Sequence, residues 1–179
     1  MTEYDIFRHI FLLLYPHIFQ KEGDIMKNYE INEDTLVIMP DRDNYGQTRI
    51  IETDEEYIVS KSGYEVMDES CQYYGSTYKG RIKAAQKILD CSYKIPIIVE
   101  ESSNLIFFPT KSSLLEDCIW LNMNSIKNYK KEGNKTRIIF NNNKEIVIDI
   151  SRLSLQNQIY RSIKLESIIR KRIENLNQK

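Results

Sequence analysis

Short stretches in which apolar and polar residues alternate cover most of the chain between residues 29 and 150. Alternation over four to eight residues, bounded by turn residues, is typical of strands that bury one face. Short polar connections, such as 53–55 and 101–104, predict hairpins between neighbouring strands. The pattern predicts strands at 29–31, 35–39, 48–52, 56–60, 96–99, 105–108, 119–122, 126–129, 136–140 and 145–150.

Two other segments repeat apolar residues at a spacing of three to four, which is typical of amphipathic helices. Residues 64–89 are predicted to form a helix in two pieces that break at Gly75. Residues 154–176 are predicted to form one long helix with Ser154 as its N-cap. A series of strands closed by a long helix predicts an α+β fold, with a curved antiparallel sheet or a small β-barrel at its centre.

The 179 residues suggest one domain, with an extension at its N-terminus. The apolar run at 6–19 follows Glu3 and Asp5 and has no small-residue cleavage site, so it lacks the marks of a signal peptide. Residues 21–24 can be encoded by a purine-rich stretch resembling a ribosome-binding site upstream of Met26. We therefore hypothesise that Met26 is the native start, that 1–25 is an extension and that 26–179 is the domain. N-terminal sequencing of the endogenous protein tests this.

Few residues in the predicted domain suit catalysis. Both histidines, His9 and His17, precede residue 26, which excludes a histidine-based triad or zinc site in the domain. The three cysteines stand 20 and 27 residues apart, which fits buried thiols in a reducing cytosol rather than a disulfide scaffold: Cys71, Cys91 and Cys118. The sequence therefore predicts a protein that is not an enzyme and needs no metal or cofactor.

Residues 75–82 have the Gly-x4-Gly spacing of a phosphate-binding loop. That motif requires Lys and Ser/Thr after its second glycine, but Arg81 and Ile82 stand there. The preceding residues are predicted to be helical, whereas a phosphate loop follows a strand. Nucleotide hydrolysis is therefore rejected.

The net charge of −1 hides a division along the chain. Residues 1–60 hold 13 acidic and 5 basic residues, a net −8, whereas residues 61–179 hold 13 acidic and 20 basic residues, a net +7. Such asymmetry indicates a polyanion-binding surface, although scattered surface charge explains it too. Basic residues gather around the two glycines at 75 and 80, in the hairpin at 127–137, and on the last helix. The first group is favoured because glycines expose backbone beside its charges: Lys79, Arg81, Lys83, Lys87 and Lys94.

A resemblance to a known family appears at these residues. The stretch at 69–81, Glu-Ser-Cys-Gln-Tyr-Tyr-Gly-Ser-Thr-Tyr-Lys-Gly-Arg, resembles the signature of the bacterial competence transcription factor family, ComK. Further matches follow in order over about residues 29–172: Lys-x-Pro-Ile at 94–97, Phe-Phe-Pro-Thr at 107–110, Cys-x-Trp at 118–120, Phe-Asn at 140–141 and Ser-x-x-Ser-x-x-Asn-Gln-x-Tyr-Arg at 151–161. The chain departs from the family at 114–117, where an acidic Leu-Leu-Glu-Asp loop replaces a frequent Arg-Pro pair.

The resemblance implies a cytoplasmic, nucleoid-associated activator of DNA-uptake genes that reads paired A/T-rich boxes of double-stranded DNA mainly through the minor groove. It also implies a homodimer or tetramer on DNA, with RNA polymerase and a Clp-protease adaptor as further partners and no membrane association. A-tracts have a narrow minor groove whose negative potential attracts Arg and Lys. Charge and the family match together identify these candidate DNA contacts: Ser76, Thr77, Tyr78, Lys79, Arg81, Lys83, Lys94 and Arg161.

Several alternatives stay open at this point. Arg161, with Asn157 and Gln158, could anchor the last helix to the sheet instead of contacting DNA. The whole chain could be a β-barrel that binds protein or lipid, an enzyme of unknown class, or a divergent paralogue with weakened DNA binding. Liposome flotation without DNA retention would favour the lipid-binding module.

Overall fold

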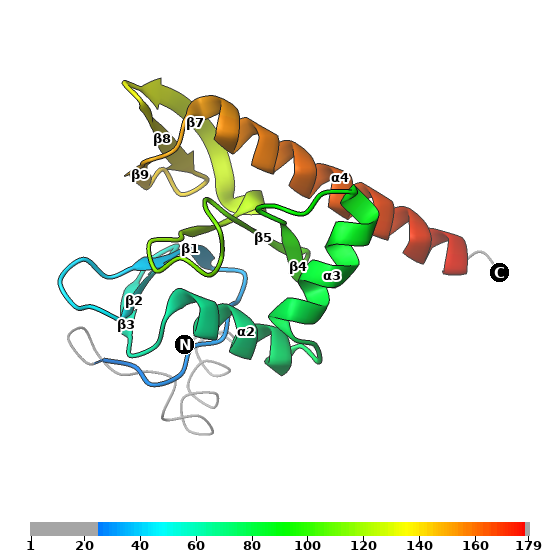
Figure 1. The fold of residues 1–179 in the computed structure, drawn as a ribbon, viewed down its shortest axis with the longest axis horizontal. Helices are drawn as coiled ribbons and strands as arrows, with labels where there is room; N and C mark the ends of the chain where they lie inside the picture. Colours follow the sequence, from blue (N-terminus) through cyan, green and yellow to red (C-terminus); the bar gives the residue numbers. More distant parts are fainter. Residues whose placement is uncertain (1–24, 178–179) are drawn as a thin grey trace, which may run out of the picture.

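The computed structural model describes residues 25–177 of the chain, which form an α+β fold as the sequence predicts (Figure 1). The hypothesis that Met26 is the native start concerns residues 1–25, and all of these except residue 25 lie outside the described residues. The elements follow the chain as β1 (Thr35–Pro40), β2 (Thr48–Glu52), β3 (Glu56–Val59), α2 (Gly63–Tyr73), α3 (Tyr78–Leu89), β4 (Ile97–Glu100), β5 (Leu105–Pro109), β6 (Trp120–Asn122), the 3-10 turn η1 (Met123–Ser125), β7 (Ile126–Glu132), β8 (Lys135–Phe140), β9 (Glu145–Ile148) and α4 (Arg152–Asn177).

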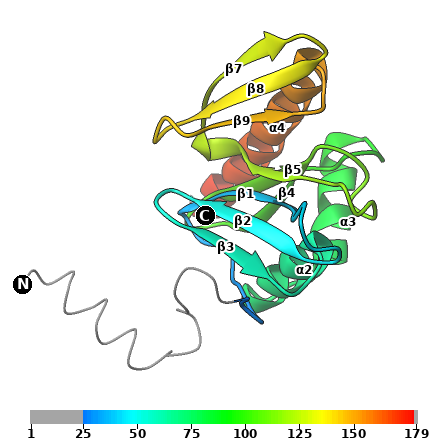
Figure 2. The same cartoon turned by 90° about the vertical axis from the view of Figure 1, so that its left-hand side faces the viewer.

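The strands form two separate antiparallel sheets. The larger has the order β3-β2-β1-β6-β5-β4, and the smaller has the order β7-β8-β9. Both sheets are open, because β3 and β4 are edges of the first and β7 and β9 are edges of the second. Figure 2 shows the smaller sheet at one end of the molecule, beside the first turns of α4. The prediction of antiparallel sheet is confirmed, and the alternative of a closed barrel is wrong.

The larger sheet is covered on both faces. One face packs against α2 in a cluster that includes Ile38, Phe107 and Trp120. The other face packs against the smaller sheet and α4 through Val37 and Phe108. This double coverage explains why β5 is buried at all five positions instead of alternating.

Helix α3 lies along the β4 edge of this sheet. Its first residue, Tyr78, joins the cluster under α2, whereas Ala85 and Leu89 join a cluster with Ile106 and Leu165 on the other face. Because α3 covers an edge rather than a face, its outward side is open to solvent.

Two local predictions are wrong. Residues 29–31 form no strand. The backbone of Ile31 bonds to side chains of α2 and its C-cap: the Ile31 amide donates to Ser70 Oγ (3.1 Å) and the Tyr74 hydroxyl donates to the Ile31 carbonyl (2.9 Å). Helix α4 begins at Arg152, and the hydroxyl of Ser151 accepts from the amide of Ser154 (3.2 Å). Ser151 is therefore the N-cap, and Ser154 lies inside the first turn.

A first prediction concerns Gly63, where α2 begins against the indole of Trp120. A Cβ atom at residue 63 would lie 2.5 Å from Trp120 Cζ3. We expect Gly63→Ala to lower the free energy of unfolding by about 1–3 kcal/mol, the usual cost of overpacking. Thermal unfolding measures this, with Gly80→Ala as control, because a Cβ there meets only the hydroxyls of Thr77 and Ser76. A melting temperature that is unchanged in Gly63→Ala would contradict the tight contact.

Candidate nucleic-acid interface

The turn between α2 and α3 is built by backbone hydrogen bonds. Gly75, at φ +77°, ends α2: its amide donates to the Gln72 carbonyl, and the Ser76 amide donates to the Cys71 carbonyl, both at 2.9 Å. This pair of bonds is the Schellman arrangement, in which glycine is favoured because φ is positive. Thr77 then caps α3, since its hydroxyl oxygen accepts from the Gly80 amide (3.0 Å). Both glycines of the sequence motif therefore serve the turn, and the Thr77 oxygen is already engaged.

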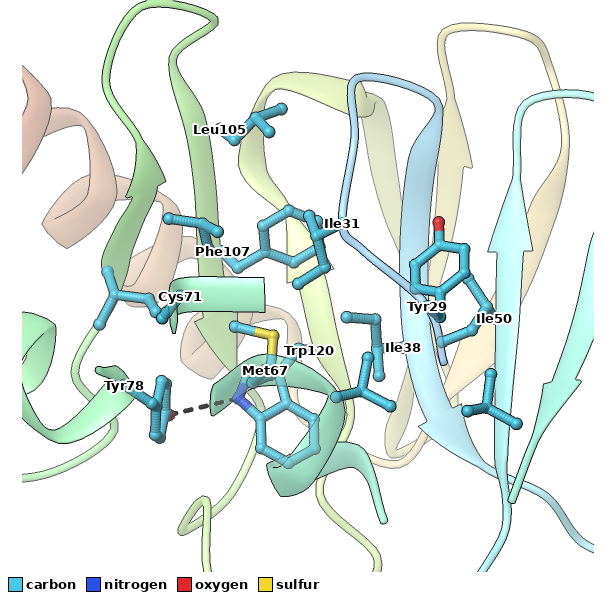
Figure 3. Packing of buried hydrophobic residues seen from close by; sticks show 14 of the residues in the cluster. Tyr29, Ile31, Ile38, Ile50, Met67, Cys71, Tyr78, Leu105, Phe107 and Trp120 are labelled. Atoms are coloured by element: carbon cyan, nitrogen blue, oxygen red, sulfur yellow. Dashed lines mark hydrogen bonds between the residues drawn. The ribbon is translucent and has the colours of Figure 1, made fainter. Parts of the chain in front are cut away.

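Tyr78 lies in the core and not on the surface. Its side chain is 1% exposed, and its hydroxyl accepts from Trp120 Nε1 at 3.3 Å (Figure 3). Its ring meets the ring of Tyr64 edge-on, and its amide donates to Asp68 Oδ1 (2.8 Å). Burial raises the pKa of Tyr78 to about 12. The prediction that Tyr78 contacts DNA is therefore corrected: this side chain fixes the start of α3 from inside.

A second prediction distinguishes a role of Tyr78 in the stability of the core from a role in DNA binding. Tyr78→Phe removes only the hydroxyl, so we expect it to lower the free energy of unfolding by about 1 kcal/mol, as for a typical hydrogen bond. Binding of A/T-box DNA by the folded variant should stay unchanged. Urea unfolding and fluorescence anisotropy measure the two quantities. A clear loss of DNA affinity with intact stability would return Tyr78 to the interface.

Arg81 is tied to neighbouring elements. Its Nη1 lies 3.1 Å from Glu101 Oε1, in the turn between β4 and β5, and its Nη2 donates to the Tyr74 carbonyl (3.4 Å). The side chain is 19% exposed, and its buried Nε has no hydrogen-bond partner within residues 25–177. Arg81 thus joins the start of α3 to the end of α2 and to the sheet, and its charge is partly neutralised.

One group of basic side chains without ion pairs in the described residues lies on the outward side of α3. Lys79, Lys83 and Lys87 follow one another at a spacing of four residues, and all three are exposed. In the described part of the chain none of them forms an ion pair. The small residues Gly80 and Ala84 are exposed beside them, so bulky side chains do not obstruct approach to this face.

Lys94 and Arg161 continue this charge beyond the C-terminal end of α3. Lys94 has φ +52°, and its ammonium lies 5.3 Å from the ring centroid of Tyr93, which is 58% exposed. Arg161 on α4 donates to the Tyr93 carbonyl (2.9 Å). We name the α3 surface by these residues: Lys79, Lys83, Lys87, Tyr93, Lys94 and Arg161.

Gln158 holds the same loop from inside the protein. It is 2% exposed, and its Nε2 donates to the carbonyls of Lys94 (2.9 Å) and Pro109 (2.8 Å). Arg161 also approaches Gln158 Oε1 at 3.4 Å, whereas Asn157 faces solvent. Gln158 therefore acts as a buried anchor, as in the alternative that these residues hold the last helix in place. Arg161 also anchors the loop at Tyr93, but it remains half-exposed.

The basic hairpin of β7 and β8 is partly neutralised. Arg137 forms ion pairs with Glu132 (2.6 Å) and Glu145 (2.8 Å), and the ammonium of Lys127 donates to Asn143 Oδ1 (2.8 Å). The sequence indicated a group of basic residues in the hairpin at 127–137 but did not show that Glu145, from β9, faces Arg137. The hairpin keeps Lys130, Lys131 and Lys135 free of ion pairs among the described residues.

The loop between β5 and β6 carries negative charge. Lys111 pairs with Asp117, and Tyr45 donates to Glu116 Oε1 (2.6 Å), while Leu114 and Leu115 are exposed. Acidic groups repel phosphate, so this loop does not extend the basic surface.

The described residues provide few groups for metal or thiol chemistry. Within 25–177, no three His, Cys, Asp or Glu side chains gather as a metal site would require. Burial raises the pKa of Cys71 to about 12 and of Cys118 to about 11, so both thiols stay protonated at neutral pH. The prediction that they are buried hydrophobes is confirmed, whereas Cys91 is half-buried. Across the described segment, no helix is long and apolar enough to span a bilayer.

Comparison with known proteins gives the class of this protein. The model of the family described as ComK protein matches residues 26–174. A "Competence transcription factor" from Bacillus subtilis (strain 168) is 32% identical over 158 residues, which cover 87% of this chain and 82% of the relative. No solved structure matches. These findings define a competence transcription factor. The chain belongs to the ComK family, as the motifs at 69–161 predict.

Proposed function

We propose that this protein binds DNA directly and activates DNA-uptake genes by reading A/T-rich boxes through the minor groove. The observation that carries the proposal is the row of lysines on the outward side of α3 that form no ion pair within residues 25–177. The whole chain has a net charge of −1, so long-range attraction to DNA must come from such a local concentration of charge. A cytoplasmic, nucleoid-associated location follows from this role.

The α3 surface suits a narrow groove bordered by phosphates. Lys79, Lys83 and Lys87 extend along about 12 Å of helix, at 1.5 Å per residue, which spans several phosphates of one strand. Minor-groove reading relies on groove width and inserted cations rather than on a recognition helix. Lys94 and Arg161 would extend the contact past the end of α3.

The remaining candidate residues act on this surface in different ways. Ser76 is half-buried in the turn, and we propose that its hydroxyl reaches a phosphate near Lys79. Thr77 acts as the cap of α3, and Arg81 positions the first turn through Glu101 and the Tyr74 carbonyl. Tyr78 takes no direct part.

The partners belong to the same proposal. Paired boxes require at least two copies, so a homodimer or tetramer on double-stranded DNA is expected. RNA polymerase and a Clp-protease adaptor are proposed from the family resemblance alone. No cofactor enters this scheme.

The full chain should be titrated against a duplex with two A/T boxes and a GC-rich duplex of equal length, at several salt concentrations. We expect preference for the A/T duplex, an affinity that falls steeply with salt, and displacement by a small cationic minor-groove ligand. Equal affinity for both duplexes would refute box recognition. Binding to vesicles of anionic lipid, with no retention of either duplex, would support the lipid-binding alternative.

A third prediction follows from the Arg81–Glu101 contact. Glu101→Gln removes a negative charge, 52% exposed, and frees Arg81 from its ion pair. We expect the affinity for A/T-box DNA to rise roughly two- to fivefold, the range of an exposed ion pair. Asp54→Asn, which removes one exposed charge from the turn after β2, is the control and should have less effect. A fall in affinity would mean that Glu101 supports the interface.

A further inference from the structure

A polar cavity of about 380 Å³ lies where turns of the two sheets meet. Its walls come from the start of β1, the β2–β3 turn, the β4–β5 turn, the segment from β6 to η1, and the β8–β9 turn. Figure 2 shows the β8–β9 turn beside the β2–β3 turn, and Asn142 Nδ2 donates there to the Thr53 carbonyl (2.7 Å). The volume lies at the lower end of the roughly 300–1,000 Å³ of small-molecule sites. A molecule bound in this cavity would therefore touch both sheets.

Asparagines are the commonest residues of the lining, and a relay of hydrogen bonds fixes three of them. Asn141 Nδ2 donates to the Asn124 carbonyl (2.9 Å), and Asn124 Nδ2 donates to the Asn104 carbonyl (2.6 Å). Asn104 Nδ2 in turn donates to Glu166 Oε1 on α4 (3.0 Å). Because every one of these amino groups faces an oxygen, the bonds also determine which amide atom is the carbonyl oxygen. Within residues 25–177 the three Oδ1 atoms have no hydrogen-bond partner, so they can accept from a bound molecule.

Charge and apolar area narrow the chemistry of the ligand. Among the described residues that line the cavity, Glu33 is the one charged side chain, and it forms no ion pair in that part of the chain. A carboxylate that has no ion pair of its own repels ligands that carry phosphate or carboxylate groups. Leu36 and Leu105, which are 3% and 4% exposed, provide apolar contact beside the amides. The site therefore suits a molecule without negative charge that carries many hydrogen-bonding groups on a small carbon skeleton.

Three other ligand classes fit this lining less well. Calcium takes about six to eight oxygen ligands, and a cavity of this volume with one carboxylate is too wide and too weakly charged for a bare cation. A nucleobase binds by stacking on aromatic side chains, but no aromatic residue belongs to the described lining. A polyamine would have Glu33 as its single ionic partner. Hydroxyl groups both donate and accept, so a polyol can bond to amides and hydroxyls alike.

We propose that this cavity binds a small uncharged polyol of monosaccharide size, whose hydroxyl groups bond to the free amide oxygens and whose carbon skeleton contacts Leu36 and Leu105. The proposal goes beyond DNA recognition, because none of the residues that define the α3 surface lines the cavity. A polyol bound between turns of both sheets stabilises the folded state over the unfolded one. The melting temperature should therefore rise with the concentration of the polyol.

Binding of defined probes to the full chain, without DNA, tests the class of ligand. We expect isothermal titration calorimetry and thermal unfolding to show binding of at least one of three neutral probes: D-glucose, D-ribose and myo-inositol. D-Glucuronate should bind more weakly than the best neutral probe, because its carboxylate meets the charge of Glu33, and spermidine should bind more weakly because the amides carry no charge. If none of the neutral probes binds, or if D-glucuronate or spermidine binds more tightly than they do, the proposal is overturned.

Side-chain amide resonances test the location. In two-dimensional nitrogen–proton NMR spectra of the full chain, the Nδ2 groups of Asn104, Asn124 and Asn141 should shift when the neutral probe is added. The Nδ2 groups of Asn134 and Asn157, which are exposed on the β7–β8 turn and on α4 outside the lining, should not shift. Shifts confined to asparagines outside the cavity would overturn the proposed site.

Substitutions test the residues themselves. Asn124→Leu/Asn141→Leu roughly keeps side-chain volume and removes two amides, so the affinity for the neutral probe should fall roughly tenfold or more. Both residues are exposed, so circular dichroism should be unchanged, and Asn134→Leu/Asn157→Leu is the matched control that should keep wild-type affinity. Glu33→Lys, at a residue that is exposed, provides a second test that does not depend on the relay: it should raise the affinity for D-glucuronate relative to the neutral probe. Unchanged affinity in the double variant, or an unchanged preference in Glu33→Lys, contradicts the proposed site.

Discussion

Replacing Lys79, Lys83 and Lys87 together with alanine should weaken binding to A/T-box DNA by roughly a hundredfold. Each exposed ammonium that meets a phosphate contributes about 1 kcal/mol at the upper end for exposed ion pairs, and three such losses correspond to about two orders of magnitude. The slope of log K against log salt should become shallower by about 0.9 for each phosphate that is no longer neutralised. Anisotropy titrations over a salt series measure both quantities.

The hairpin provides a control with the same change of charge. Lys130, Lys131 and Lys135 are exposed and free of ion pairs in the described residues, like the three lysines of α3. Their triple replacement with alanine should lower affinity only through the loss of net charge. All six side chains are exposed, so neither triple variant should lose stability. If the hairpin variant loses affinity and the α3 variant keeps it, DNA binds at the smaller sheet instead.

The sequence located the basic region but could not tell which of its charges are free. Arg81 and Lys83 look equivalent in the motif, yet Arg81 faces Glu101, which lies 20 residues away in sequence. Tyr78 stands among polar residues and was predicted to be on the surface, but α3 turns it inward toward Trp120. Both differences arise from tertiary contacts between α3 and the sheet. The sequence did contain a signal for Tyr78: the spacing of seven and four residues places Tyr78, Ala85 and Leu89 on one face of a helix, which predicts that Tyr78 is buried with them.

The fold was predictable wherever local pattern decides structure. Alternation identified strands such as Thr48–Glu52, and the break at Gly75 separated α2 from α3. The segment at 29–31 was misassigned, because Tyr29 and Ile31 are buried while the backbone of Ile31 bonds to the side chains of Ser70 and Tyr74 instead of to a strand. The division into two sheets was also missed. It depends on which strands pair, and β1 pairs with β6 across more than 80 residues of chain.

Gln158→Leu should lower the free energy of unfolding by about 2–4 kcal/mol. The two side chains have similar volume, so the change removes hydrogen bonds more than packing. Gln158 is 2% exposed, and its Nε2 satisfies the carbonyls of Lys94 and Pro109, which belong to segments distant in sequence. A buried polar group left without a partner costs about 1–3 kcal/mol. Urea unfolding measures the loss, and Gln156→Leu, exposed on the same helix, should change stability little.

The same substitution should also weaken DNA binding by the folded protein, because Gln158 fixes the backbone that carries Lys94. Residue 94 has φ +52°, a conformation that costs free energy for any residue other than glycine and persists only when neighbours hold it. Without the bond to its carbonyl, the Tyr93–Lys94 segment keeps the bond from Arg161 to the Tyr93 carbonyl but loses a contact that fixes Lys94, so Lys94 can shift away from the α3 surface. Lys94→Ala removes the charge but keeps the Gln158 bond. If Gln158 affects DNA binding by fixing the position of Lys94, Gln158→Leu should cause little further loss of affinity in a Lys94→Ala background. Fully additive losses of affinity would show that Gln158 acts on DNA binding by another route.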